Sequence, residues 1–200
     1  MGQLASDDFT RADSTGLGAN WASAPAAEQW DVSSNQARNT HTNGPFYGRY
    51  VGVSAPADQY AKLRMKAFTA DFGTGPAVRM ASSQQTCYYV RCNTANSGLY
   101  KLINSVETQI GSNFAAVAVN DIVELWAQGT TLTVLVNGAS VLTQTDSAIS
   151  SGDFGAYGMT YVASTIAWDD WYGGDFTTPS PPSDSLNVVI GEAQIGGRIF

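Results

Sequence analysis

The feature that most constrains this chain is an alternation of apolar and polar side chains with a period of two. In residues 59–68 one set of alternate positions is apolar and the other is polar or charged: Ala61, Leu63, Met65 and Ala67 against Tyr60, Lys62, Arg64 and Lys66. Successive side chains of a strand point to opposite faces, so this pattern predicts a half-buried β-strand. A helical period is almost absent from the rest of the sequence.

Turn residues divide the remaining chain into further candidate strands. Asn137-Gly138 is a pair favoured in two-residue hairpins, and Gln128-Gly129-Thr130 predicts a turn just before it. The expected strands cover 46–54, 76–82, 86–93, 98–104, 121–127, 131–136, 139–142, 154–161 and 165–172. Turns about every eight to twelve residues are typical of a β-sandwich or barrel. With 14% charged residues and 20 glycines, the composition also disfavours a helical bundle.

The segment 10–45 has a different composition. It is rich in Gly, Ala, Ser and Asn, with Trp21 and Trp30 embedded in it. We expect a long segment that follows the surface, forms short strands and is anchored by the two tryptophans.

The composition also divides the chain near its end. Residues 1–176 are expected to form one sandwich domain, and the Pro- and Ser-rich residues 177–185 an extended linker that cannot pair within a sheet. Residues 186–200 are apolar and too short to fold alone, so we expect an arm that docks on a neighbouring subunit or on its own domain. The arm residues expected to make this contact are Val188, Ile190, Ile195, Ile199 and Phe200.

Motifs at both ends of the expected domain resemble one superfamily. Asp7-Asp8-Phe9 with Leu17-Gly18-Ala19-Asn20-Trp21, and the late run from Ile166 to Tyr172, resemble the concanavalin A-like jelly-roll superfamily, especially its laminin-G-like branch. In that branch an early Asp-Phe strand lies beside a late Asp-Asp-aromatic strand. The meander between them is matched here by Gly75 to Arg79, Asn120 to Trp126 and Asn137-Gly138. The resemblance covers about residues 7–176 and implies an antiparallel β-sandwich. Similar openings occur in bacteriophage virion and tail proteins and in secreted bacterial modules.

The charge of the chain argues against two classes of partner. The formal net charge is −7, and the three lysines Lys62, Lys66 and Lys101 form no basic run. We therefore expect neither nucleic-acid binding nor association with an anionic membrane. The first residues lack the basic and apolar regions of a secretory signal peptide.

The two cysteines are expected to stay reduced. Cys87 and Cys92 are five residues apart in one candidate strand, so their side chains point to opposite faces and lie roughly 16 Å apart. A disulfide requires Cα atoms within about 7 Å. We expect one or both thiols to be packed as small apolar groups.

Catalysis is not expected from the acidic residues. Retaining glucanases of this superfamily carry glutamates on one strand face, with nucleophile and acid about 5–5.5 Å apart. Asp121 and Glu124 would face opposite sides of a strand, and the only histidine, His41, lies in a turn-like stretch without a nucleophile elbow. The four glutamates form no such paired motif: Glu28, Glu107, Glu124 and Glu192.

Asp169-Asp170 invites two interpretations. One is that a carboxylate accepts backbone hydrogen bonds near the N-terminal strand at Asp7-Asp8. The other is a calcium site, although calcium requires six to eight oxygen ligands. No other metal or cofactor is expected.

Aromatic residues are the candidates for sugar contacts, because pyranose rings present C–H faces to aromatic rings. We expect a concave polar groove in which Tyr60, Tyr89 and Arg91 contact a glycan. The full set of candidate glycan-binding residues is Tyr60, Arg64, Tyr89, Arg91 and Trp171. The alternative for each is packing in the core or cross-strand pairing on an exposed face.

Together these observations lead to two hypotheses about function. The first is a non-catalytic structural or binding protein of a virus particle, either a head decoration or a tail component, that forms homo-oligomers, contacts other virion subunits and binds surface glycans. The second is an extracellular carbohydrate-binding module or a domain related to glycoside hydrolases.

Overall fold

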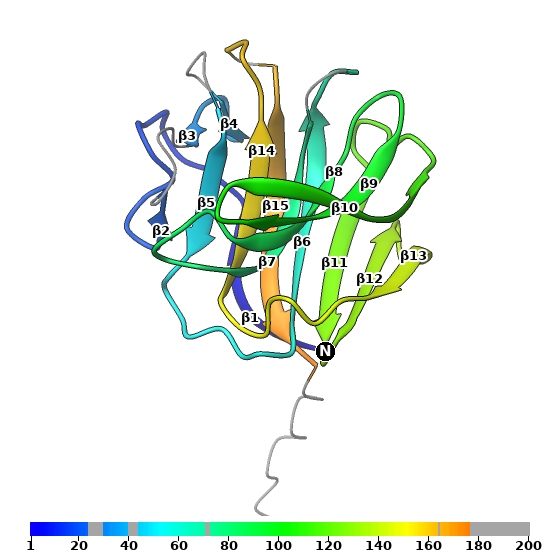
Figure 1. Ribbon diagram of the computed structural model, residues 1–200. Helices are drawn as coiled ribbons and strands as arrows, with labels where there is room; N and C mark the ends of the chain where they lie inside the picture. The colour runs from blue at the N-terminus through cyan, green and yellow to red at the C-terminus, as the bar shows by residue number, and fades with distance from the viewer. Residues whose placement is uncertain (24–29, 40–43, 71–72, 164, 177–200) are drawn as a thin grey trace, which may run out of the picture.

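The computed structural model describes residues 1–23, 30–39, 44–70, 73–163 and 165–176, and they form two antiparallel sheets packed face to face (Figure 1). The eight-stranded sheet contains β1 (Gly2–Asp7), β3 (Asp31–Val32), β4 (Ala37–Arg38), β6 (Gln59–Ala67), β11 (Ile122–Gln128), β12 (Thr131–Val136), β13 (Ala139–Thr145) and β15 (Ala167–Asp175). The seven-stranded sheet contains β2 (Trp21–Ala22), β5 (Phe46–Tyr50), β7 (Gly73–Met80), β8 (Cys87–Arg91), β9 (Ser97–Ile103), β10 (Val106–Phe114) and β14 (Asp153–Met159). The predicted antiparallel β-sandwich is thus confirmed. The described residues include no helix long and apolar enough to cross a membrane.

The order of the strands brings the two ends of the domain together. The eight-stranded sheet runs β13-β12-β11-β6-β15-β4-β3, and β1 pairs with β15 as well. The seven-stranded sheet runs β10-β9-β8-β7-β14-β5-β2. Gly2 lies opposite Asp175 and Asp7 opposite Trp171, so the N-terminus lies beside the end of β15 (Figure 1). The expected pairing of the early Asp-Phe segment with the late aromatic strand is confirmed.

The alternating segments form strands where they were predicted. β6 buries Ala61, Leu63 and Met65 against the core, and β11 and β12 form the hairpin partners beside it. Asn137 and Gly138 adopt positive φ angles of 52° and 79°, as a two-residue hairpin turn requires.

β10 is absent from the predicted strands. Along its nine residues Ile110 is buried, and nearly all of the others are exposed. It is the edge strand of the seven-stranded sheet, and Gly111, with a φ of 76°, interrupts its register. A strand exposed on both faces has no apolar alternation to reveal it.

Tryptophans fill the space between the sheets. Trp30, Trp168 and Trp171 are almost completely buried, which confirms Trp30 as an anchor of the 10–45 segment. The half-buried ring of Trp21 lies 4.8 Å from the ring of Trp171. The linker 177–185, the arm 186–200 and His41 lie outside the described residues.

Both cysteines are free, buried and on opposite faces of the seven-stranded sheet, as predicted. Cys92 belongs to the core between the sheets, whereas Cys87 belongs to a second apolar cluster on the outer face. Burial raises the pKa of both thiols, so both remain protonated at neutral pH and are poor nucleophiles.

Arg79 connects several loops at one end of the sandwich. Its side chain is 2% exposed, and its guanidinium donates to the carbonyl oxygens of Ala57, Gly129 and Ile149 at 3.1, 2.7 and 2.8 Å. A φ of 53° turns the residue out of the regular strand, and its backbone N–H donates to Oε1 of Gln59.

We predict that Arg79→Met lowers the free energy of unfolding by about 3 kcal/mol or more, because the carbonyl groups of Ala57, Gly129 and Ile149 lose a charged donor and the bond to Ile149 is buried. Urea unfolding followed by tryptophan fluorescence measures the change. Arg64→Met is the matched control, since Arg64 makes a half-exposed ion pair and its loss should cost about 1 kcal/mol or less. Equal losses of unfolding free energy for the two variants would contradict the role of Arg79 in connecting these loops.

The burial of the thiols predicts a second outcome. Neither Cys87 nor Cys92 should react with a thiol reagent in the native protein, and both should react once the protein is unfolded without reductant. A mass two hydrogens lower than that of the reduced chain would instead reveal a disulfide.

Candidate functional site

The outer face of the seven-stranded sheet carries an aromatic cluster that is separate from the core. Alternation produces it, because Tyr88 and Val90 point into the core and Tyr89 between them points outward. The ring of Tyr89 lies 4.4 Å from that of Tyr157 and 5.6 Å from that of Tyr100. This outer cluster contains Tyr47, Ala77, Met80, Cys87, Tyr89, Tyr100, Leu102 and Tyr157.

A carboxylate is held at the edge of this cluster. Glu107, on β10, accepts a hydrogen bond from the hydroxyl of Tyr89 at one oxygen and from Nη1 of Arg91 at the other, the latter at 2.8 Å. Arg91 also donates to the hydroxyl of Tyr100, and its guanidinium carbon lies 4.0 Å from the centre of that ring. Side chains from two other strands, β8 and β9, therefore fix the position of Glu107.

Tyr89 and Tyr157 remain neutral. Burial raises the pKa of Tyr89 far above its ordinary value, and the charge of Glu107 raises it further. Burial also raises the pKa of Tyr157. Tyr89 therefore acts as a hydrogen-bond donor to Glu107 over the whole range of physiological pH.

Glu107 also lines a hollow of about 330 Å³ on the outer face, here called the Glu107 hollow. Tyr157, Leu102 and Met159 supply apolar wall, and Gln85 of the β7–β8 connection and Ser105 of the β9–β10 turn add polar groups. A mainly apolar wall with a few fixed polar groups is the usual composition of a small-ligand site.

The structure separates the five residues predicted to bind glycans. Tyr89 and Arg91 lie together in the network around Glu107. Tyr60 and Arg64 belong to β6 of the other sheet, so the expected groove shared by Tyr60, Tyr89 and Arg91 is not formed. Trp171 is fully buried between the sheets, where its Nε1 donates to the carbonyl of Gly155. The alternative of core packing therefore describes Trp171.

Asp169 and Asp170 lie in a bulge of β15. Asp170 has a φ of 46°, and the register against β6 shifts between Asp169 and Tyr172. Asp169 accepts a hydrogen bond from the N–H of Asp170, while Asp170 accepts one from Nε of Arg64 at 2.7 Å. The expected backbone hydrogen bond is present, but it is local and does not involve the N-terminal strand. No group of three or more His, Cys, Asp or Glu side chains that suits a metal ion occurs in the described part of the chain.

The carboxylates on the outer face of the seven-stranded sheet are far apart. Asp153, on β14, is ion-paired with Arg49 of β5. Four strand spacings of about 4.8 Å separate β10 from β14, which puts Glu107 and Asp153 roughly 19 Å apart. Glu124 lies on β11 in the other sheet, where it accepts a hydrogen bond from the indole of Trp126.

Glu107 is the site residue that the sequence analysis missed as a ligand contact. It lies on the unpredicted strand β10, directly after a turn in which Asn104 and Ser105 have φ angles of 51° and 68°. Asn-Ser is a weaker hairpin signal than Asn-Gly, yet it follows a predicted strand directly. A two-residue turn at Asn104-Ser105, followed by a returning strand, would have placed Glu107 opposite Leu102.

Comparison with known proteins identifies the fold. No protein-family profile and no curated sequence matches the chain. Carbohydrate binding module CBM66 from Bacillus subtilis is similar in structure, with a TM-score of 0.59 and 13% identity over 78% of this chain and 94% of that one. A β-1,3-1,4-glucanase (lichenase) from a mouse hindgut metagenome has a TM-score of 0.55 and 14% identity, covering 85% and 97% of the two chains. The exoplasmic/lumenal domain of VIP36, solved in a Ca²⁺- and mannose-bound form, has a TM-score of 0.57 and 8% identity, covering 80% of this chain and 85% of that one.

The chain has the concanavalin A-like jelly-roll fold. At such identities the likeness extends to the fold alone.

Proposed function

We propose that this protein is a carbohydrate-binding module that holds a neutral sugar in the Glu107 hollow. The observation that carries the proposal is the fixed pairing of an acceptor and a donor, Glu107 and Arg91, beside an apolar wall. The solved structures with the same fold include a carbohydrate binding module, a glucanase and a mannose-bound domain, which supports this ligand class.

The chemistry of sugar hydroxyls suits this pairing. Each hydroxyl both donates and accepts a hydrogen bond, so two adjacent hydroxyls can donate to the carboxylate of Glu107 and accept from Arg91. Both side chains are about one-third exposed, at 32% and 31%, so each remains partly accessible to solvent. The apolar wall that includes Tyr157 and Leu102 can contact the C–H face of the ring.

The proposal takes the second of the two hypotheses derived from the sequence. Nothing in the comparisons supports a role in a virus particle, and the arm 186–200 on which that role rested lies outside the described residues. Glycan binding, which both hypotheses include, is retained.

We also propose that the module is not catalytic. Glycosidases use two carboxyl groups between about 5 and 9.5 Å apart. On the outer face of the seven-stranded sheet, the described carboxylates Glu107 and Asp153 are about twice that distance apart, and each is ion-paired with an arginine.

Glu107→Gln tests the binding site. A panel of neutral and acidic polysaccharides first identifies the ligand, and calorimetry then measures its affinity. The amide keeps the shape of Glu107 but loses its charge and one acceptor oxygen, so affinity should fall at least about tenfold. Glu124→Gln makes the same change on the opposite sheet and should leave affinity unchanged. A larger effect from Glu124→Gln, or no glycan bound by the native protein, would refute the proposed site.

The absence of catalysis is tested with the same panel. We expect no release of reducing sugar from β-glucans or galactans between acidic and alkaline pH. Turnover that Glu107→Gln or Asp153→Asn abolishes would overturn this part of the proposal.

A further inference from the structure

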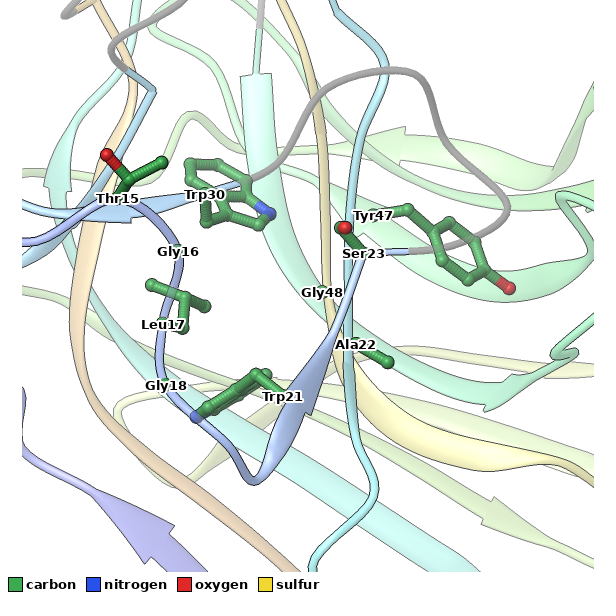
Figure 2. Close-up of a pocket in the computed structure, with 10 residues that line it drawn as sticks. All are labelled: Thr15, Gly16, Leu17, Gly18, Trp21, Ala22, Ser23, Trp30, Tyr47 and Gly48. Carbon is green, nitrogen blue, oxygen red and sulfur yellow. The ribbon is translucent and has the colours of Figure 1, made fainter.

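A second pocket lies at the opposite edge of the sandwich from the β9–β10 hairpin, and it is here called the Trp30 pocket. It has a volume of about 250 Å³ and lies between the loop 15–18, the short strand β2 and β5 (Figure 2). Leu17, Trp21 and Trp30 line it with apolar surface, and Thr15 and Ser23 add hydroxyl groups. Among the described residues that line this pocket there is no charged side chain, so it suits an uncharged ligand.

The pocket contains a buried donor without a partner. Trp30 is 1% exposed, and its Nε1 has no hydrogen-bond partner among the described residues. Figure 2 shows the nitrogen edge of the indole turned toward the strand that carries Gly48 and Tyr47. Gly48 permits this approach, because a Cβ atom there would lie 3.0 Å from Cδ1 and 3.5 Å from Nε1 of the indole. A buried donor left unpaired costs about 1–3 kcal/mol, which an acceptor on a ligand would recover.

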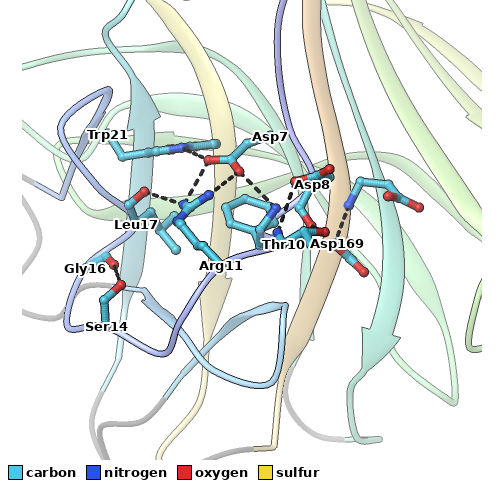
Figure 3. A network of polar contacts seen from close by, with 11 residues as sticks. Asp7, Asp8, Thr10, Arg11, Ser14, Gly16, Leu17, Trp21 and Asp169 are labelled. Atoms are coloured by element: carbon cyan, nitrogen blue, oxygen red, sulfur yellow. Dashed lines mark hydrogen bonds and ion pairs between the residues drawn. The ribbon is translucent and has the colours of Figure 1, made fainter.

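The wall opposite Trp30 is held rigidly by one carboxylate. Asp7 accepts hydrogen bonds from both terminal nitrogens of Arg11, at 2.6 and 3.1 Å, and from Nε1 of Trp21 at 2.9 Å (Figure 3). Arg11 in turn donates to the carbonyl of Leu17 at 2.7 Å. The indole nitrogen of Trp21 is thereby turned away from the pocket, and its ring is fixed as an apolar wall.

The backbone of the loop is also satisfied without a ligand. The N–H of Gly16 donates to Asp31 at 2.7 Å, and the carbonyl of Gly18 accepts from the N–H of Trp21 at 3.0 Å. The loop therefore holds its shape before binding, which lowers the entropy that a ligand must overcome. In this preformed pocket, the unpaired indole N–H of Trp30 is the donor that a ligand could bind.

We propose that the Trp30 pocket is a second ligand site and that it binds the acetamido group of an N-acetylated sugar. The amide carbonyl accepts the hydrogen bond of Trp30 Nε1, and the acetyl methyl group packs against Leu17 and Trp21. A neutral amide oxygen is a strong acceptor that needs no countercharge, which matches the uncharged lining. Because Nε1 is shielded from solvent, binding includes a small adjustment of the lining side chains.

The test follows the indole N–H resonances of the full-length protein by NMR, with Trp30 assigned from Trp30→Phe. Titration with methyl N-acetylglucosaminide should shift the Trp30 indole resonance saturably. Methyl glucoside, which has the same ring with a hydroxyl in place of the acetamido group, should bind about tenfold more weakly or not at all. Equal affinity for the two sugars, or no saturable shift at Trp30, would overturn the proposal.

Three variants separate this site from the Glu107 hollow. Trp30→Phe keeps an aromatic ring but removes the donor, and should weaken binding of the N-acetylated sugar about tenfold. Trp126→Phe, the matched change on the outer face of the eight-stranded sheet, should bind like the native protein. Glu107→Gln should also leave this titration unchanged. If Glu107→Gln abolishes the binding while Trp30→Phe does not, the sugar occupies the Glu107 hollow and the Trp30 pocket is not a site.

Discussion

The two sheets of this sandwich depend on the hydrogen bonds of one buried arginine. Arg79 lies in the seven-stranded sheet, yet its guanidinium donates to the turn between β11 and β12 and to the connections before β6 and before β14. Gln59, the first residue of β6, accepts from the backbone of Arg79 and donates to the carbonyls of Pro56 and Gly152. A hydrophobic core resists separation of the sheets but is not directional. These directional bonds fix the position of the strand ends of one sheet relative to those of the other.

The opposite edge is fixed in a comparable way by Asp7. Its carboxylate holds Arg11 and Trp21, and Arg11 holds the loop at Leu17 (Figure 3). Asp7 also ends β1, which pairs with β15. A single residue therefore joins the first strand, the last strand and the irregular 10–45 segment. Because charged hydrogen bonds hold this irregular segment in place, the loop 15–18 and the short strand β2 can form a defined pocket against β5.

Local sequence predicted most of the strands but, outside the Asn137-Gly138 hairpin, not the partners of each strand. The alternation in 59–68 separated Tyr60 from the buried face of its strand, and Tyr89, expected to contact a glycan, does lie on an outer face, yet nothing local indicated that the two strands belong to different sheets. Trp171 has the same local pattern as a surface aromatic, and its burial follows from the bulge at Asp170 and the pairing with β1. Glu107 was not predicted as a site residue because its strand is exposed on both faces. Sheet membership and edge strands are set by contacts between segments far apart in the sequence, which a local period of two does not record.

The hydrogen bonds of Glu107 are the observation on which the proposed binding role depends. Both of its oxygens are engaged, one by the hydroxyl of Tyr89 and the other by the guanidinium of Arg91. A carboxylate held in this way still has a free lone pair on each oxygen, so it can accept hydrogen bonds from a sugar. A catalytic nucleophile or acid must instead attack or donate a proton at the anomeric centre, with a second carboxyl group close by. Tyr89 and Arg91, whose side chains donate these hydrogen bonds to Glu107, carry no carboxyl group. The contacts that orient Glu107 therefore support the proposed binding role.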